Sequence, residues 1–279
     1  MKITNKYNLP QSLVNVVSNF HRPTIGRYSA SDIKAPPFVR KLKEEHWDEL
    51  EQDVSDMLWL ILGSATHYII QGGAPPESLA EEKMTTEYAG CTIVCVPDLW
   101  EEGVITDWKI TSAWSFILGD KPEWEKQLNI YKWMYTRHGF HTDKLQIHAI
   151  LRDWTKSKAL ANSDYPQIAF QSVDVPVWDD AKTEKMIRDW IAELDLPMPC
   201  SDEERWARPT TWAVMENGRK TALRVLNSED EAWSWLKNYN CKKGKTYNVV
   251  ERPGEYIRCK SYCNVAPFCS ENPYLKVAA

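Results

Sequence analysis

The stretch that decides the fold is IVCVPDLWEEGVITDWKITS, residues 93–112. Its two apolar runs are separated by the turn sequence EEG, so we expect a strand, a turn and a second strand. Side chains alternate across a strand, which places Asp107 and Lys109 on one face and Trp108 on the other. The turn brings Asp98 back toward this pair. Two carboxylates and an ammonium at one place are the groups that metal-assisted cleavage of a phosphodiester requires.

The composition is that of a globular protein. The chain has 279 residues, 43% apolar and 26% charged, enough for one domain of ordinary size plus a smaller annex. The net charge of −5 excludes a uniformly basic surface, so a nucleic-acid-binding protein of this kind must confine its positive charge to a groove. Candidate basic patches, or else simply solvated side chains, lie at residues 22–27, 40–43 and 242–245. The 14 Trp and 12 Tyr indicate core packing for most rings and base stacking for others.

The N-terminal sequence lacks the long apolar segment of a secretory signal. The longest apolar run, residues 57–63, is too short to span a bilayer. We therefore expect a cytoplasmic protein without a membrane partner, in the host cytoplasm if it is phage-encoded. Reduced thiols or metal ligands then explain the seven cysteines better than disulfides do. Cys91 and Cys95 alternate along a strand and are expected in the core.

Helices and strands alternate along the chain. Apolar spacing, proline and glycine predict helices over 37–50, 53–71, 121–138 and 179–194, and further strands over 81–89, 144–153 and 167–175. This order indicates an α/β fold with a central sheet of mixed direction, flanked by helices. We expect the main domain to cover residues 1–197. Residues 198–279 then form a smaller Cys-rich C-terminal region with a helix over 228–239.

Further polar residues accompany the strand pair. His67 lies in an apolar helix, where a lone histidine is more often a core residue than a ligand. Gly63 precedes it by one turn and permits close approach of another element. Glu82 comes before the strands. Gln127 and Tyr131 are four residues apart, so they share one helical face and are suited to holding a strand backbone or the catalytic lysine.

These motifs follow one another in the order G-x-x-x-H, E-K, P-D, D-x-K and Q-L-x-x-Y. In this order they resemble the RecB-like branch of the PD-(D/E)xK nucleases, which includes the nuclease domains of RecB and AddB, the CRISPR-adaptation nucleases and many phage exonucleases. The stretches DVSDMLWLILGSATH and GVITDWKITSAW look most like phage-encoded members. The resemblance covers residues 28–135 and implies a restriction-endonuclease-like core.

The resemblance also implies a metal site. It implies that His67, Asp98 and Asp107, with the backbone carbonyl of Trp108, bind a divalent cation. Carboxylates and imidazole suit Mg²⁺ or Mn²⁺. Lys109 would orient the attacking water or stabilise charge on the scissile phosphate.

Two supporting roles are implied as well. Gln127 and Tyr131 would support the site and the DNA backbone. Glu82 matches an acidic family position, and Glu81 is the alternative because the sequence EEK leaves the register open.

Three cysteines, Cys259, Cys263 and Cys269, lie close together near the end of the chain. Such a concentration indicates a metal or cluster site, with ordinary apolar packing as the alternative. The family resemblance implies a [4Fe–4S] cluster held by three C-terminal cysteines and one upstream, and Zn²⁺ is the other candidate. Cys200 is the expected fourth ligand, and Cys241 is the second choice.

We therefore expect a metal-dependent deoxyribonuclease, an exonuclease that acts on DNA ends or single strands. A role in phage-type DNA recombination, replication or degradation follows from the resemblance. Its partners would be linear or single-stranded DNA, a recombination protein or further copies of the chain. The alternative is a catalytically decayed nuclease fold that binds nucleic acid or protein, against which the intact Asp98, Asp107 and Lys109 speak. A third possibility is a scaffold organised by metal or redox chemistry in the tail.

Overall fold

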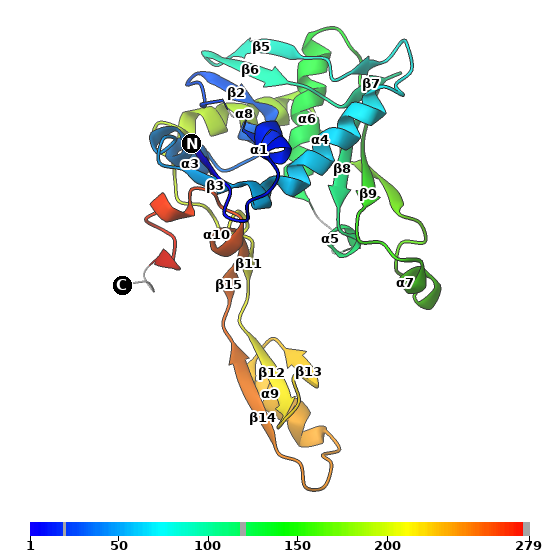
Figure 1. Cartoon of the computed structure of the whole chain (residues 1–279), viewed down its shortest axis with the longest axis vertical. Coiled ribbons are helices and arrows are strands. Elements are labelled where there is room, and N and C mark those ends of the chain that lie inside the picture. Colours follow the sequence, from blue (N-terminus) through cyan, green and yellow to red (C-terminus); the bar gives the residue numbers. More distant parts are fainter. Residues whose placement is uncertain (19–20, 118–120, 276–279) are drawn as a thin grey trace. The chain divides into compact units, whose positions relative to one another are not determined.

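The computed structural model describes residues 1–18, 21–117 and 121–275. The chain divides into two compact units, Met1–Met198 and Pro199–Ala279. Both contain helices and β-sheets, so the protein has a mixed α/β architecture (Figure 1). Within the described ranges, no helix has the length and apolar character needed to cross a bilayer.

The largest sheet of the first unit has five strands in the order β10–β9–β8–β7–β4. Their bounds are β4 Leu79–Ala80, β7 Leu99–Glu101, β8 Val104–Thr111, β9 Lys144–Leu151 and β10 Phe170–Val175. The β8–β9 pair is parallel and the other pairs are antiparallel, so the sheet is mixed, as the sequence predicts. The turn between β7 and β8 contains Glu102 and Gly103, both with positive φ, which the glycine adopts without strain.

Helix α6 (Pro122–Arg137) connects the parallel strands β8 and β9 and packs against both. It starts with a proline in its first turn and ends before Gly139, which has a φ of 86°. Its buried side chains include Leu128, Ile130, Trp133 and Met134, all of which are in the main hydrophobic core. Helix α4 (Leu58–Gln71) also contacts β8, and Figure 1 shows α4 and α6 beside this strand.

The remaining elements of the first unit surround this sheet and helix. A three-stranded sheet has the order β2–β6–β5, and a parallel pair joins β1 to β3. The bounds are β1 Lys2–Thr4, α1 Gln11–Val17, β2 Arg27–Ser29, α2 Ala30–Ile33, α3 Pro37–Glu45, β3 Glu51–Asp53, β5 Met84–Tyr88, β6 Cys91–Cys95, α5 Ala113–Ile117, α7 Lys156–Ala161 and α8 Asp180–Glu193, with a 3₁₀ helix at Val54–Met57. Cys95 is buried and Cys91 packs against the same core, as expected.

Several sequence expectations need correction. The helix expected over 37–50 ends at Glu45, and the helix expected over 53–71 begins with a 3₁₀ turn before α4. A Cβ added at Gly63 would meet nothing within 4 Å, so the close approach expected there is wrong. Arg40 does not belong to a basic surface patch, because it is 5% exposed and pairs with Asp32 and Glu44. Burial of a guanidinium is tolerated when carboxylates satisfy it.

The second unit consists of short elements. Its strands form a three-stranded sheet in the order β13–β12–β14 and a two-stranded sheet of β11 and β15. The bounds are β11 Ala207–Arg208, β12 Thr211–Glu216, β13 Arg224–Leu226, α9 Glu229–Asn238, β14 Tyr247–Arg252, β15 Glu255–Tyr256 and α10 Ile257–Ser261, with a 3₁₀ helix at Ala266–Phe268. Helix α9 corresponds to the helix expected over 228–239, and Ser228 caps its N-terminus by accepting a hydrogen bond from the backbone N–H of Glu231.

Candidate functional site

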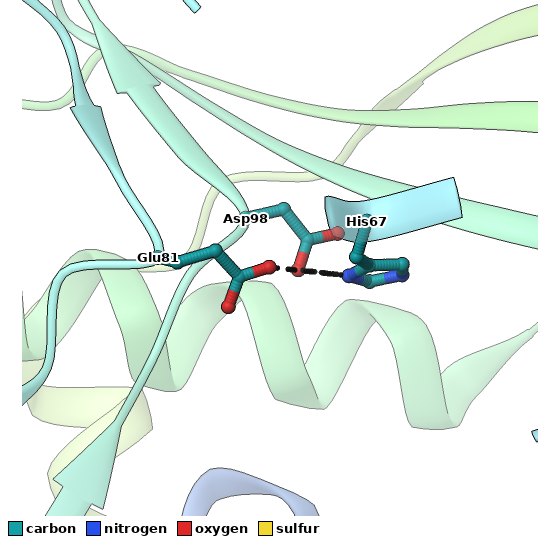
Figure 2. A group of neighbouring side chains, drawn as sticks. All are labelled: His67, Glu81 and Asp98. Carbon is teal, nitrogen blue, oxygen red and sulfur yellow. Dashed lines mark hydrogen bonds and ion pairs between the residues drawn. The ribbon is translucent and has the colours of Figure 1, made fainter. Parts of the chain in front are cut away.

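Three side chains from separate elements meet in the first unit. His67 projects from α4, Glu81 follows β4, and Asp98 stands just before β7 (Figure 2). His67 Nδ1 lies 3.3 Å from Glu81 Oε1 and 3.2 Å from Asp98 Oδ1. One ligand atom from each residue lies within 4.8 Å of the others, so the three could hold a metal ion together.

The backbone brings the two carboxylates of this group together. Strands β4 and β7 pair antiparallel, and the pairing extends by one hydrogen bond from Glu81 N to Asp98 O at 3.3 Å. Glu81 adopts a φ of 54°, a left-handed conformation that non-glycine residues rarely occupy. Such strain occurs often at functional sites, and Figure 2 shows the Glu81 side chain directed toward His67.

The group carries a proton where a cation would bind. The ion pair with Asp98, helped by Glu81, raises the pKa of His67 to about 9, although partial burial opposes the shift. Burial raises the pKa of Glu81, and the nearby charge of Asp98 raises it further. An imidazole nitrogen and two carboxylates are donors that suit Mn²⁺ and Mg²⁺, so the residues fit the expected divalent ion.

Asp107 and Lys109 lie on one face of β8, as the alternation of side chains predicts. Asp107 is 1% exposed and forms an ion pair with Lys109. Burial raises the pKa of Asp107, and the Lys109 charge acts in the opposite direction. Asp98 Oδ2 accepts a hydrogen bond from the backbone N–H of Trp108 at 2.5 Å. Asp98 therefore links the three-residue group to the strand that carries Asp107 and Lys109.

The side chain of Trp108 packs on the opposite face of the sheet. Its ring makes a T-shaped contact with His148, with ring centroids 4.8 Å apart, and these two residues are partners in the β8–β9 pairing. Phe170 of β10 adds a tilted contact. This packing orients β8 so that its polar residues face α4 and α6.

Gln127 and Tyr131 share a face of α6, as predicted. Gln127 Nε2 donates a hydrogen bond to Tyr131 Oη at 2.6 Å, and both side chains are buried. Gln127 Oε1 accepts a hydrogen bond from Lys34 Nζ at 2.6 Å. Lys34 follows α2 and was not among the residues expected at the site. No local pattern marks it, because a lysine after a short helix is ordinary; only the packing of α2 on α6 brings it here.

Glu81 and Glu82, the two alternatives for the acidic position, lie in different surroundings. Glu81 joins His67 and Asp98, whereas Glu82 is exposed and lies outside every three-residue ligand group found among the described residues. Asp107 is also outside this group, although its charge acts on Glu81. His67, Asp98, Asp107, Lys109, Gln127 and Tyr131 thus lie in one region of the first unit, and Glu81 and Lys34 lie there as well.

The four cysteines of interest all belong to the second unit. Cys200, Cys259, Cys263 and Cys269 are half-buried free thiols. Burial raises the pKa of Cys200 to about 12, and the nearby thiols of Cys263 and Cys269 contribute to the shift. Burial likewise raises the pKa of Cys259 and of Cys263, and each of these also senses Cys269. The four thiols therefore lie close enough for the charge of one thiolate to affect the pKa of another. Cys241 is exposed.

Among the described residues, these thiols do not form a group with the close spacing of ligands on one metal ion. Sulfurs around one Zn²⁺ lie about 4 Å apart, because each Zn–S bond is about 2.3 Å. In the described part of the chain, no three cysteine sulfurs lie within 4.8 Å of one another. A cuboidal iron–sulfur cluster holds its four thiolates at separate corners and so spreads them further apart.

Comparisons with known proteins give structural similarity alone. No model of a known protein family matches the chain, and no curated protein matches it. Similar solved structures include the crystal structure of SSO0001, at 18% identity and a TM-score of 0.45, over 70% of this chain and 87% of that one. They also include an alkaline exonuclease (LHK-Exo) from Laribacter hongkongensis, at 14% identity and a TM-score of 0.37, over 67% of this chain and 93% of that one. Its complex with dAMP matches at 17% identity and a TM-score of 0.34, over 61% and 89% of the two chains.

Proposed function

We propose that the protein is a divalent-metal-dependent deoxyribonuclease, with the first unit as a PD-(D/E)xK core of the RecB-like type. The observation that carries this proposal is the meeting of His67, Glu81 and Asp98 beside the Asp107–Lys109 pair. A structural ion-pair cluster does not need this composition. A nuclease does, since it must hold a cation and present a further positive charge to the phosphate.

Each residue then has a role in hydrolysis. His67, Glu81 and Asp98 would hold the ion, and Asp107 and the backbone carbonyl of Trp108 would be further ligands. When bound, Mg²⁺ or Mn²⁺ supplies Lewis-acid polarisation of a phosphoryl oxygen and a lower pKa for a bound water.

The lysine acts on the phosphate itself. The Lys109 ammonium, held in place by Asp107, orients the attacking water or stabilises negative charge on the scissile phosphate. Gln127 and Tyr131 support this side of the site through their hydrogen bond.

The substrate we propose is DNA with an end or a single-stranded segment, cleaved by an exonuclease in phage-type recombination, replication or degradation. An exposed aromatic surface supports single-strand binding. Trp59 is 60% exposed, and the Arg152 guanidinium carbon lies 4.2 Å from its ring centroid. Arg152 N donates to the carbonyl of Thr111 at 2.9 Å, the last residue of β8, two positions after Lys109. A base can stack on the exposed part of such a ring, and a neighbouring guanidinium can bind a phosphate of the same strand.

We further propose that the second unit holds a metal cofactor on Cys200, Cys259, Cys263 and Cys269. We favour a [4Fe–4S] cluster over Zn²⁺ because the resemblance to the RecB-like nucleases implies one. The four half-buried thiols, whose charges act on one another, would supply its ligands. Such a cofactor would stabilise the small second unit, whose core is limited.

The nuclease proposal is tested with the purified protein, Mn²⁺ and a substrate panel. The panel contains 5′- and 3′-labelled single and double strands and a closed circle. We expect linear DNA to be degraded, Asp107→Asn to abolish this, and Glu77→Gln, at an exposed acid outside the three-residue group, to leave it intact. Lack of cleavage with every divalent ion would contradict catalysis. Retained binding of DNA would then favour a non-catalytic nucleic-acid-binding role.

A further inference from the structure

We infer that Lys34 and Lys109 together form an anion-binding site that receives a phosphate group of the nucleic-acid substrate, so that two lysines rather than one contact the phosphate. This inference rests on the proposed nuclease function. It goes beyond that function by adding a phosphate-binding residue from a different element, 93 positions before Gln127.

The backbone around Lys34 is held rigidly. Ser29 and Asp32 cap the helix α2 reciprocally, since the Ser29 hydroxyl accepts from Asp32 N at 3.1 Å and the Asp32 carboxylate accepts from Ser29 N at 2.9 Å. Lys34 N donates to Ala30 O at 3.1 Å, and the carbonyl of Ala35 accepts from Trp190 Nε1 at 2.7 Å. Lys34 is therefore presented by a fixed turn rather than by a loose surface loop.

The ammonium of Lys34 has fewer hydrogen-bond acceptors than donors. An ammonium group has three N–H donors. Within the described ranges, one acceptor lies in hydrogen-bonding reach, Gln127 Oε1 at 2.6 Å, and no carboxylate lies within ion-pair distance. Gln127 is fixed in turn by Tyr131, to which its amide donates. Two donors of a half-buried ammonium thus remain available for a ligand.

The charges around Lys34 are those of the active site. Burial lowers the pKa of Lys34, and the charge of Lys109 lowers it further, while Asp107, Glu123 and Asp98 act in the opposite direction. Lys109 already has Asp107 as its partner, but Lys34 has only an amide oxygen. Among the described residues, the Lys34 ammonium therefore keeps two donors beside the charged groups of the site, with no carboxylate in ion-pair reach. An anion can accept hydrogen bonds from these donors, and a phosphate offers several strong acceptor oxygens.

A purely structural role for Lys34 predicts a different result of its replacement. If Lys34 only tethered α2 to α6, its removal would change stability but not affinity for an anion. The side chain of Met has a similar apolar stem without the charge, so Lys34→Met separates the two roles, and Lys34→Arg keeps the charge. Lys185→Met is the matched control, since Lys185 is a well-exposed lysine of α8.

The experiment titrates inorganic phosphate into the Mg²⁺-loaded full-length protein by calorimetry and measures kcat and KM on labelled DNA in parallel. We expect Lys34→Met to weaken phosphate binding about tenfold or more, as loss of a charged hydrogen bond does. Cleavage should fall about 100-fold, as for a lost charge-stabilising donor. Lys34→Arg should recover part of both. Metal affinity and melting temperature should stay near those of Lys185→Met.

The outcomes separate this inference from the nuclease proposal. Parental phosphate affinity and cleavage in Lys34→Met would overturn the two-lysine site while leaving the nuclease proposal intact. Phosphate binding that weakens only together with metal affinity would also overturn it, since the metal site would then be the cause. A parent protein that cleaves no DNA but binds phosphate in a Lys34-dependent way would contradict the nuclease and support the anion site.

Discussion

The backbone N–H of Trp108 donates a hydrogen bond to Asp98 Oδ2 at 2.5 Å, while Oδ1 of the same carboxylate lies 3.2 Å from His67 Nδ1. Asp98 is thus shared between the strand that carries Asp107 and Lys109 and the helix that carries His67. This contact explains how the hairpin and α4 form one site. It also means that replacing Asp98 disturbs both halves, so single substitutions at the other residues are more informative.

Glu81 and Glu82 provide a matched pair of acidic residues. We expect Glu81→Gln to weaken Mn²⁺ binding about tenfold or more, because a carboxylate of the ligand group is lost. Glu82→Gln should bind Mn²⁺ like the parent protein, since Glu82 lies outside the group. Calorimetric titration of Mn²⁺ measures both. Equal effects of the two substitutions would contradict the assignment of Glu81.

Metal binding should release a proton from His67. Its pKa is about 9 without a metal, so His67 is an imidazolium near neutral pH. A cation cannot share the ring nitrogen with that proton, and metal affinity should therefore rise about tenfold per pH unit below this pKa and level off above it.

Titrations at pH 7.5 in buffers of different ionisation enthalpy count the protons released. We expect about one per ion, falling toward zero in His67→Ala. An affinity that does not change between pH 6 and pH 8 would show that His67 is not a ligand.

The proposed cluster on the four cysteines predicts the metal content of the purified protein. Protein purified anaerobically should contain iron and absorb in the visible range, and Cys259→Ser should lose both. Cys241→Ser is the control, because Cys241 is exposed and was only the second choice as a ligand. Zinc without iron would select the alternative ion. Absence of both metals would reduce the tail to ordinary packing of thiols.

Trp59 should contribute to single-strand binding. We expect Trp59→Ala to weaken binding of a labelled single strand by about 1–3 kcal/mol, the usual contribution of one stacked base, and to affect duplex binding less. Trp233→Ala is the control, since this ring is 43% exposed and belongs to the second unit. Fluorescence anisotropy with Asp107→Asn as background, to prevent cleavage, measures the difference. Equal losses in both variants would exclude a specific stacking role.

Local periodicity was sufficient to predict much of the site. The period of a strand places Asp107 and Lys109 on one face with Trp108 on the other, and the period of a helix places Gln127 beside Tyr131. The turn between the strands likewise brings Asp98 to Trp108. These relations depend only on residues close together in the chain.

The sequence by itself determined the strand pair, the α6 face and the grouping of three cysteines near the end of the chain. Only the tertiary structure decided that Glu81 rather than Glu82 meets His67, because the answer depends on a positive φ and on the β4–β7 pairing. It also decided that Lys34 joins the site. Periodicity describes neighbours within one element, whereas the contacts of α2 with α6 and of α4 with β8 depend on packing between segments far apart in the chain.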